Sequence, residues 1–267
     1  MRGFVNLSLN YVSSQEERGL IKHYSANIIH IFVINKKKQE YMVYQKLEYY
    51  LSQPRLNRFL IATGNSKTKA QKLYRINLRV AQSFYPVLNL FEIFFRNTVN
   101  YQVSSYFANP NWIITEKNGF MSDPSLSPSR FFLKNSITKA ERAIRRRGGT
   151  VTPGKVVAEQ TLGYWTSLFD THHYRLIGGV VIHCFPNKPT HINRNLLNQK
   201  LNRVREFRNR IYHNEPICFN GNIVDFTEAL NIKNEIYELL NWIDVDLTNY
   251  VDYFNGIDSK TNMINNL

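Results

Sequence analysis

The sequence has few cysteines, few acidic residues relative to basic ones, and no long apolar run. Its only cysteines, Cys184 and Cys218, lie far apart and outside any C-x-x-C pattern. This argues against a disulfide scaffold or a structural zinc site, and it fits a reducing compartment. No apolar run approaches the roughly 20 residues of a membrane helix, and the first residues lack the apolar core of a secretory signal. We therefore expect a cytoplasmic protein that is not inserted in a membrane.

Motifs of several cofactor-dependent and metal-dependent enzymes are also missing. The chain contains no P-loop, no G-x-G-x-x-G, no G-x-S-x-G and no H-E-x-x-H. His172 and His173 are adjacent, a spacing that does not easily place both side chains on one metal ion. We expect neither a cofactor nor a metal site.

Basic residues are abundant and unevenly spread. Lys and Arg number 34 against 20 Asp and Glu, a net charge of +14. Residues 224–258 hold eight acids and one lysine, so the remainder of the chain carries +21. The excess is concentrated in residues 139–147 and 194–210. Either run alone is compatible with a solvated helix face, but two runs on such a basic chain favour a polyanionic partner, and we expect RNA.

The pattern of apolar residues predicts three parts. Residues 1–41 show no clear helical period, and Met42 directly follows a lysine cluster, so we expect an irregular N-terminal extension that lies upstream of the natural start. A small N-terminal subdomain is the alternative. Residues 42–256 follow an amphipathic helical pattern. Residues 257–267 are expected to form a polar tail.

Within the helical part, local signals predict individual elements. Apolar residues recur every three or four positions from residue 66 to residue 107, with Pro86 expected to kink or break the helix. Residues 108–126 are expected to form a loop. Ser127 followed by Pro128 is typical of a helix start, for a helix that ends at Arg147. Further helices are expected over residues 192–213 and 227–254, which gives an all-α fold.

The segment VREFRNRIYHNEPI, residues 204–217, carries the most specific chemistry. Arg208 and Asn209 precede His213 on one predicted helix, and Pro216 is expected to end that helix. A guanidinium can grip a phosphate as a planar fork, and an imidazole can exchange a proton near neutral pH. This set of side chains suits a phosphodiester substrate.

Helix geometry separates two of these groups. Arg208 and His213 are five residues apart, about 140° around a helix axis, so they do not share one face. Either the last turn unwinds or the site is assembled from two facing helices. Structural explanations also remain: His213 as a helix-end histidine favoured by the dipole, and Arg208 as a salt-bridge partner of Glu206 or Glu215.

Three segments resemble a known family in their order along the chain. The R-N-x-x-x-H spacing followed by NEP, together with residues 46–100 and LGYWTSLF at 162–169, resembles the Abi-like (abortive-infection) branch of the HEPN superfamily. The resemblance covers residues 42–245. It implies a HEPN-type helical bundle with additional helices, and it matches Glu92, Arg96 and Asn97 to an E-x-x-x-R-N element that supports the motif helix. No histidine follows Arg96 at the required spacing, so we expect no second catalytic motif there.

The resemblance implies a metal-independent endoribonuclease of phage defence or toxin type, acting as a homodimer that an antitoxin or regulatory RNA could silence. Arg208, Asn209 and His213 are the expected catalytic residues, and Glu92 and Arg96 are expected to pair. A non-catalytic RNA-binding or dimerisation module and a regulatory partner protein are the alternatives. Phe207 and Tyr212 are candidates for stacking on a base. The expected RNA-binding residues are Arg145, Arg146, Arg147, Arg203, Arg205, Arg210 and Tyr212.

Overall fold

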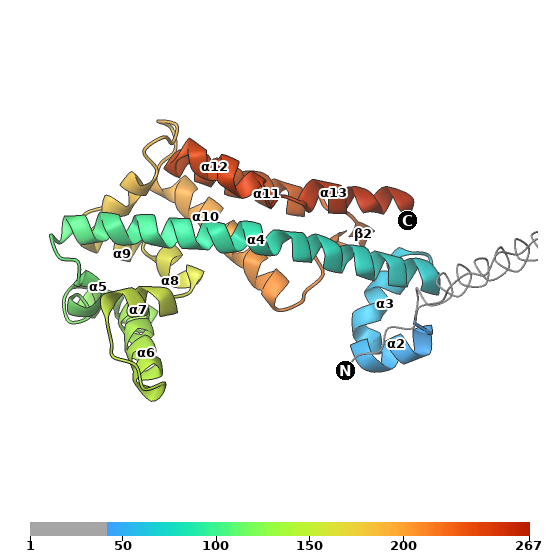
Figure 1. Cartoon of the computed structure of the whole chain (residues 1–267), viewed down its shortest axis with the longest axis horizontal. Coiled ribbons are helices and arrows are strands. Elements are labelled where there is room, and N and C mark those ends of the chain that lie inside the picture. Colours follow the sequence, from blue (N-terminus) through green and yellow to red (C-terminus); the bar gives the residue numbers. More distant parts are fainter. Residues whose placement is uncertain (1–41) are drawn as a thin grey trace, which may run out of the picture. The chain divides into compact units, whose positions relative to one another are not determined.

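The computed structural model of this chain describes residues 42–267 and is built almost entirely from helices. Figure 1 shows the order of the elements. The predicted extension at residues 1–41 lies outside the described residues. The long elements are α4 (Lys67–Tyr106), α6 (Phe132–Arg146), α10 (Arg194–Tyr212) and α11 (Thr227–Ile243). Among the described residues, one antiparallel pair, β1 (Phe219–Asn220) and β2 (Ile223–Val224), is the only sheet. The expectation of an all-α fold is confirmed.

Two compact units divide the chain between Gln71 and Lys72, within α4. In the first unit, α2 (Tyr44–Leu51) and α3 (Gln53–Ala62) are separated by Ser52, which has a positive φ of 72°. The Gln71 side chain donates a hydrogen bond to the carbonyl of Met42. This boundary lies inside the single domain predicted for residues 42–256, and that domain assignment stays a prediction.

Helix α4 continues through Pro86 without a break. The expected break at this proline is therefore wrong, whereas the expected kink stays a prediction. Proline removes one backbone donor and crowds the preceding turn. On either side of it, however, Phe84, Val87 and Phe91 are fully buried. Apolar burial along one face outweighs that local cost, since each fully buried side chain of this size contributes about 1.5–3 kcal/mol.

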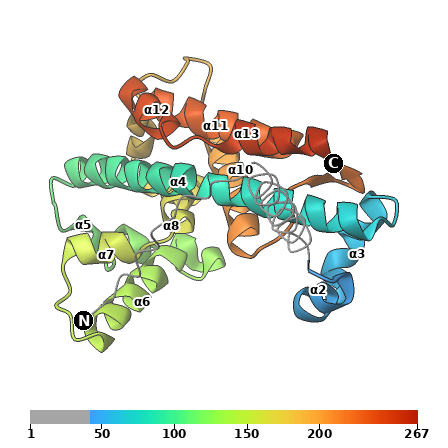
Figure 2. The same cartoon turned by 45° about the vertical axis from the view of Figure 1, so that its right-hand side comes forward.

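The core of the second unit is centred on the buried face of α4. Phe95 stacks on Phe91 and packs against Phe169 and Phe185, with ring centroids 5.7–6.0 Å apart. Helix α10 crosses α4 (Figures 1 and 2) and contributes Phe207, whose ring meets Phe84 edge-on at 4.9 Å. These contacts fix α10 against α4, and they place the end of the motif helix beside the middle of α4.

The segment between α4 and α6 contains more helix than its sequence predicts. Residues 108–126, expected to be a loop, include α5 (Trp112–Thr115), η1 (Phe120–Ser122) and the start of η2 (Pro124–Ser129). The helix expected from Ser127 begins instead at Phe132. The carboxylate of Asp123 caps η2, and Arg130 and Phe131 are both left-handed, so the helical backbone is interrupted before α6 begins.

Shorter elements connect α6 to α10 and complete the C-terminal part. The connection is formed by α7 (Pro153–Glu159), α8 (Leu162–Ser167), α9 (Thr171–Leu176) and η3 (Val180–Cys184). The helix expected over residues 227–254 is divided at Asp244, which is extended and caps α12 (Val245–Asp252). Residues 257–267, expected to be a polar tail, form α13 (Ile257–Thr261) and η4 (Asn262–Asn266). Ile257 is fully buried, so this segment is packed into the fold.

Candidate functional site

The motif helix α10 has defined caps at both ends. The Asn193 side chain accepts from the backbone N–H of Leu196 at the start. At the other end, Asn214 is left-handed with φ 57°. Its N–H bonds to the carbonyl of Ile211, and the N–H of Glu215 bonds to the carbonyl of Arg210. This is a Schellman motif, and asparagine is one of the residues that can adopt the left-handed conformation it requires. Asn214, rather than the expected Pro216, therefore ends the helix.

The last turn of α10 remains helical up to the motif histidine. The N–H of His213 bonds to the carbonyl of Asn209 at 2.9 Å, and His213 is the C-cap residue. The expected possibility of an unwound last turn is therefore wrong. Asn209 and His213 are four residues apart and share one side of the helix, whereas Arg208 and Tyr212 share the neighbouring side. Both Asn209 and His213 are exposed to solvent.

Arg208 is held from two directions. Its guanidinium lies 3.5 Å from the carboxylate of Glu92 on α4 and 4.0 Å from the centre of the Tyr212 ring. The side chains of Arg208 and Glu92 are only 22% and 17% exposed, so the pair is shielded from bulk water. Tyr212 in turn packs against Tyr85 of α4, with ring centroids 5.2 Å apart. The partner found is thus Glu92, and neither Glu206 nor Glu215 makes this contact.

The E-x-x-x-R-N element on α4 faces α10 through its first residue. Among residues 42–267, Glu92 has an ion pair within 4.0 Å with Arg208 and none with Arg96, so the expected pairing along α4 is wrong. The Nε atom of Arg96 is buried without a hydrogen-bond partner, and Arg96 and Asn97 are half-buried. Glu92 therefore links the two segments that the sequence singles out separately.

Arg208 also meets its neighbour Asn209. Its Nη1 atom donates to the Asn209 side-chain oxygen at 3.4 Å. Around the helix axis, Asn209 lies between Arg208 and His213. The end of α10 thus presents a guanidinium, an amide and an imidazole in sequence over about 140° around the helix axis. This set can bind an anionic oxygen, orient it by hydrogen bonding and exchange a proton.

The other arginines of α10 contact different partners from Arg208. Arg203 pairs with Glu235 at 2.7 Å, and Arg210 pairs with Glu228 at 2.6 Å, both on α11. Arg205 lies 3.5 Å from the hydroxyl of Thr166 on α8. Their contact with RNA stays a prediction. Phe207, a candidate for base stacking, is 1% exposed and belongs to the core, whereas Tyr212 is 41% exposed.

A buried hydrogen bond that the sequence did not predict fixes the backbone of the segment that follows the motif helix. The Asn77 side-chain oxygen accepts a hydrogen bond from the backbone N–H of Ile217 at 2.8 Å, and both residues are buried. The two positions are 140 residues apart. No local signal marks an asparagine that serves a distant backbone group, so this contact could not be predicted from periodicity.

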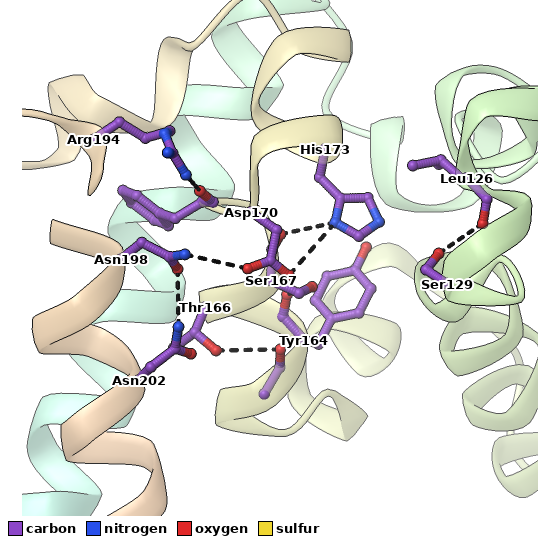
Figure 3. Close-up of polar contacts among 12 residues, drawn as sticks. Leu126, Ser129, Tyr164, Thr166, Ser167, Asp170, His173, Arg194, Asn198 and Asn202 are labelled. Carbon is purple, nitrogen blue, oxygen red and sulfur yellow. Dashed lines mark hydrogen bonds and ion pairs between the residues drawn. The ribbon is translucent and has the colours of Figure 1, made fainter. Parts of the chain in front are cut away.

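Another side of α10 carries a ladder of polar contacts (Figure 3). Arg194 donates to the carbonyl of Phe169, and Asn198 donates to Asp170 and accepts from Asn202. Together with the Arg205 contact, these bonds fix the position of α10 along α8 and α9. The catalytic candidates lie beyond the end of this ladder, so the ladder serves to place them.

His173, on α9, is buried. Its Nδ1 atom is 2.8 Å from the carbonyl oxygen of Ser167 (Figure 3), and its Nε2 atom has no hydrogen-bond partner. Burial lowers the pKa of His173 below its usual value. No group of three or more His, Cys, Asp or Glu side chains within residues 42–267 is placed to hold a metal ion.

The arginines of the basic run at the end of α6 differ in their ion-pair partners. Arg145 is 3.8 Å from Glu141, and Arg147 forms an ion pair with Glu159. Arg146 is exposed, and no carboxylate among the described residues lies within 4.0 Å of it. The three arginines that the sequence groups together therefore differ in how much charge they leave uncompensated.

Both cysteines are free and buried, and burial raises the pKa of the Cys184 thiol. Within residues 42–267, no helix is long and apolar enough to cross a membrane. Comparison of the chain with protein-family models, with curated proteins and with solved structures gave no match.

Proposed function

We propose that this chain is a metal-independent endoribonuclease whose active site is at the end of α10. The observation that supports this most directly is that Arg208, Asn209 and His213 lie together at one regular helix end. The same residues carry the resemblance to the Abi-like branch of the HEPN superfamily, which suggests a role in phage defence or as a toxin. The net charge of +14 favours a polyanionic substrate.

The proposed reaction uses a nucleophile that RNA itself supplies. The 2′-oxygen attacks the adjacent phosphorus, the bond from phosphorus to the 5′-oxygen breaks, and the products are a 2′,3′-cyclic phosphate and a 5′-hydroxyl. His213 takes the proton of the 2′-hydroxyl or gives one to the leaving 5′-oxygen, a role worth about 10²–10⁴ in rate. Arg208 stabilises the negative charge on the phosphoryl oxygens, and Asn209 orients the phosphate or the imidazole.

Glu92 and Tyr212 act on this reaction through Arg208. A free arginine side chain loses up to about 2 kcal/mol of rotamer entropy when it is fixed. Contacts at 3.5 Å with Glu92 and 4.0 Å with Tyr212 restrict the guanidinium before substrate arrives. We assign Glu92 as a positioning residue, since it contacts Arg208 and not the reacting atoms.

A composite site in a homodimer explains the angle between Arg208 and His213. The helix remains regular to Tyr212, so one copy presents the two groups about 140° apart. A two-fold axis beside the end of α10 would place each motif helix opposite its copy, and one subunit could then supply the imidazole while the other supplies the guanidinium. A silencing antitoxin or regulatory RNA would act by occupying this site.

The first experiment measures cleavage of single-stranded RNA by the purified chain in the presence of EDTA. We expect cleavage by wild type, none by His213→Ala, and none when the scissile 2′-hydroxyl is replaced by hydrogen. Glu206→Ala, about two turns before His213 and exposed, is a control for surface substitution. Strict dependence on magnesium, or efficient cutting of the deoxy-substituted substrate, would contradict internal attack.

The second experiment tests the composite site. Arg208→Ala and His213→Ala proteins are expected to be inactive alone and to regain part of the activity when they are mixed and allowed to exchange subunits. A mixture of His213→Ala with a His213→Ala, Arg208→Ala double variant is the control, because it cannot restore an intact site. A protein that is monomeric by light scattering and still cleaves RNA would exclude the shared site.

The ion pair between Arg208 and Glu92 is also compatible with a second function. Pairing with a shielded carboxylate is what a structural arginine would show. In that case the chain would be an RNA-binding or dimerisation module without catalysis, or a regulatory partner. Binding of RNA without cleavage, unchanged by His213→Ala, would establish this alternative.

A further inference from the structure

One side of α6 carries a row of basic residues. Lys139, Arg142 and Arg146 lie within about 60° around the helix axis and span about 10 Å along it, at 100° and 1.5 Å per residue. The opposite side of α6 is buried through Leu133 and Ile144 and packs against α7 and η1. The row therefore faces away from the fold.

The charges of this row are not compensated within the protein. Glu141, on another side of α6, forms ion pairs with Lys117 at 2.8 Å and with Arg145 at 3.8 Å. Glu159 forms an ion pair with Arg147. Among residues 42–267, no carboxylate lies within 4.0 Å of Lys139, Arg142 or Arg146. Uncompensated cations in a row raise the local concentration of a polyanion and gain free energy when they neutralise it.

The surface along the row has the composition of a strand-binding site. A hollow of about 500 Å³ lies along it, and its described lining belongs to α6 alone: Asn135, Thr138, Lys139, Arg142, Ala143 and Arg146. Phe132 lies on the same side at the start of the helix and is 41% exposed. Basic side chains beside an exposed aromatic ring form the usual platform for single-stranded nucleic acid, since the cations follow the backbone and the ring stacks on a base.

We infer that Lys139, Arg142 and Arg146, with Phe132, form a docking site for single-stranded RNA on α6, separate from the residues proposed to cleave it. This inference rests on the proposed function for the identity of the nucleic acid. The proposed site includes only one of the three arginines that the sequence groups together. Arg146 belongs to the site, whereas Arg145 and Arg147 are engaged by Glu141 and Glu159.

The test compares two double variants of equal charge on the same helix. Arg142→Gln with Arg146→Gln removes two uncompensated cations, and Arg145→Gln with Arg147→Gln removes two paired ones. Each is combined with His213→Ala, and binding to a labelled single-stranded RNA is measured by fluorescence anisotropy at several salt concentrations. Thermal melting of each variant confirms that it is folded.

The first double variant should lose about tenfold or more in affinity at low salt. Its slope of log K against log salt should fall by about 1.4, or about 0.7 for each phosphate that is no longer neutralised. The second should keep its slope nearly unchanged. Equal losses in both variants would attribute binding to net charge and overturn the docking site. Unchanged binding in both would also overturn it, as would dependence on Arg142 and Arg146 only for anionic lipid vesicles.

Phe132→Ala tests the contribution of base stacking to RNA binding independently of charge. Loss of base stacking should weaken RNA binding about five- to 150-fold, with no change in the salt slope, because no ion is released. Unchanged affinity would remove Phe132 from the site.

The docking site and the proposed function fail in different ways. If wild type does not cleave RNA but Arg142→Gln with Arg146→Gln lowers affinity as expected, the nuclease proposal is wrong and the docking site stands. If wild type cleaves RNA but the two double variants bind alike, the docking site is wrong and the nuclease proposal stands.

Discussion

Replacing Glu92 with glutamine removes one charge from the contact between α4 and α10 and preserves the size of the side chain. The two charged groups are 3.5 Å apart, and the side chains are 17% and 22% exposed. Breaking a fully buried ion pair costs about 3–5 kcal/mol, whereas an exposed pair contributes about 0.2–1 kcal/mol. Since this pair lies between those limits, we expect Glu92→Gln to lower the free energy of unfolding by about 1–3 kcal/mol.

For a chain of this size, that loss corresponds to a decrease in Tm of roughly 3–10 °C. The assay is a double-mutant cycle in urea with Glu92→Gln, Arg208→Gln and the double variant. It isolates the coupling energy of the pair, which we expect to be about 1–2 kcal/mol. The Tyr212 ring remains over position 208 in every member of the cycle, so its contribution cancels to first order.

Lys233 and Asp258 provide the matched control pair. Their charged atoms are closer, at 2.6 Å, but Asp258 is 51% exposed. If shielding from water decides the coupling, the control pair should give about 0.2–1 kcal/mol despite its shorter distance. A coupling between Glu92 and Arg208 that is no larger than the control would refute our assignment of Glu92 as the residue that positions Arg208.

Four further substitutions test the fold around the site. Asn77→Ala leaves the buried N–H of Ile217 without an acceptor and should cost about 1–3 kcal/mol in urea denaturation; an unchanged midpoint would show that water replaces the amide. Asn214→Val should cost about 1–2 kcal/mol because φ is 57°, while Asn214→Gly should be tolerated; equal effects would contradict a conformational cause. Burial lowers the folded-state pKa of His173, so the unfolded chain takes up a proton first and stability should decline as pH falls below about 6.5. His173→Phe should reduce that slope between pH 6.5 and 5, and an identical pH profile would exclude His173 as its origin. Pro86→Ala should raise Tm, since it restores a backbone donor within α4; a lower Tm would show that the core requires the proline.

The spacing of apolar residues predicted those helices whose sequence signals lie within the helix itself. The helix expected over residues 192–213 lies within two residues of the observed bounds of α10. Apolar periodicity located α4, but the same reasoning was wrong about Pro86, because a propensity rule does not include the burial of Phe84 and Val87. Pro216 was expected to cause the end of α10, whereas the left-handed Asn214, two residues earlier, ends it.

The basic run on α6 shows the same limit for charge. The sequence identifies Arg145, Arg146 and Arg147 as cationic, and this is a property of each side chain alone. Whether each charge is compensated depends on Glu141 and Glu159. Only one of these acids, Glu141, lies on the same helix, and helix geometry directs it to Arg145 rather than to Arg146.

The sequence by itself determined the helical class, the positions of the motif helix and of α4, the excess of positive charge, and the set of residues Arg208, Asn209 and His213. Each of these depends on residue identity or on spacing within about 20 positions. Only the tertiary structure decided that Glu92 pairs with Arg208 across 116 positions of chain and that Asn77 holds the backbone of Ile217. The physical reason is that such contacts follow from how α10 crosses α4, and that crossing is set by the packing of apolar faces such as Phe84 on Phe207. The polar partners are brought together as a consequence.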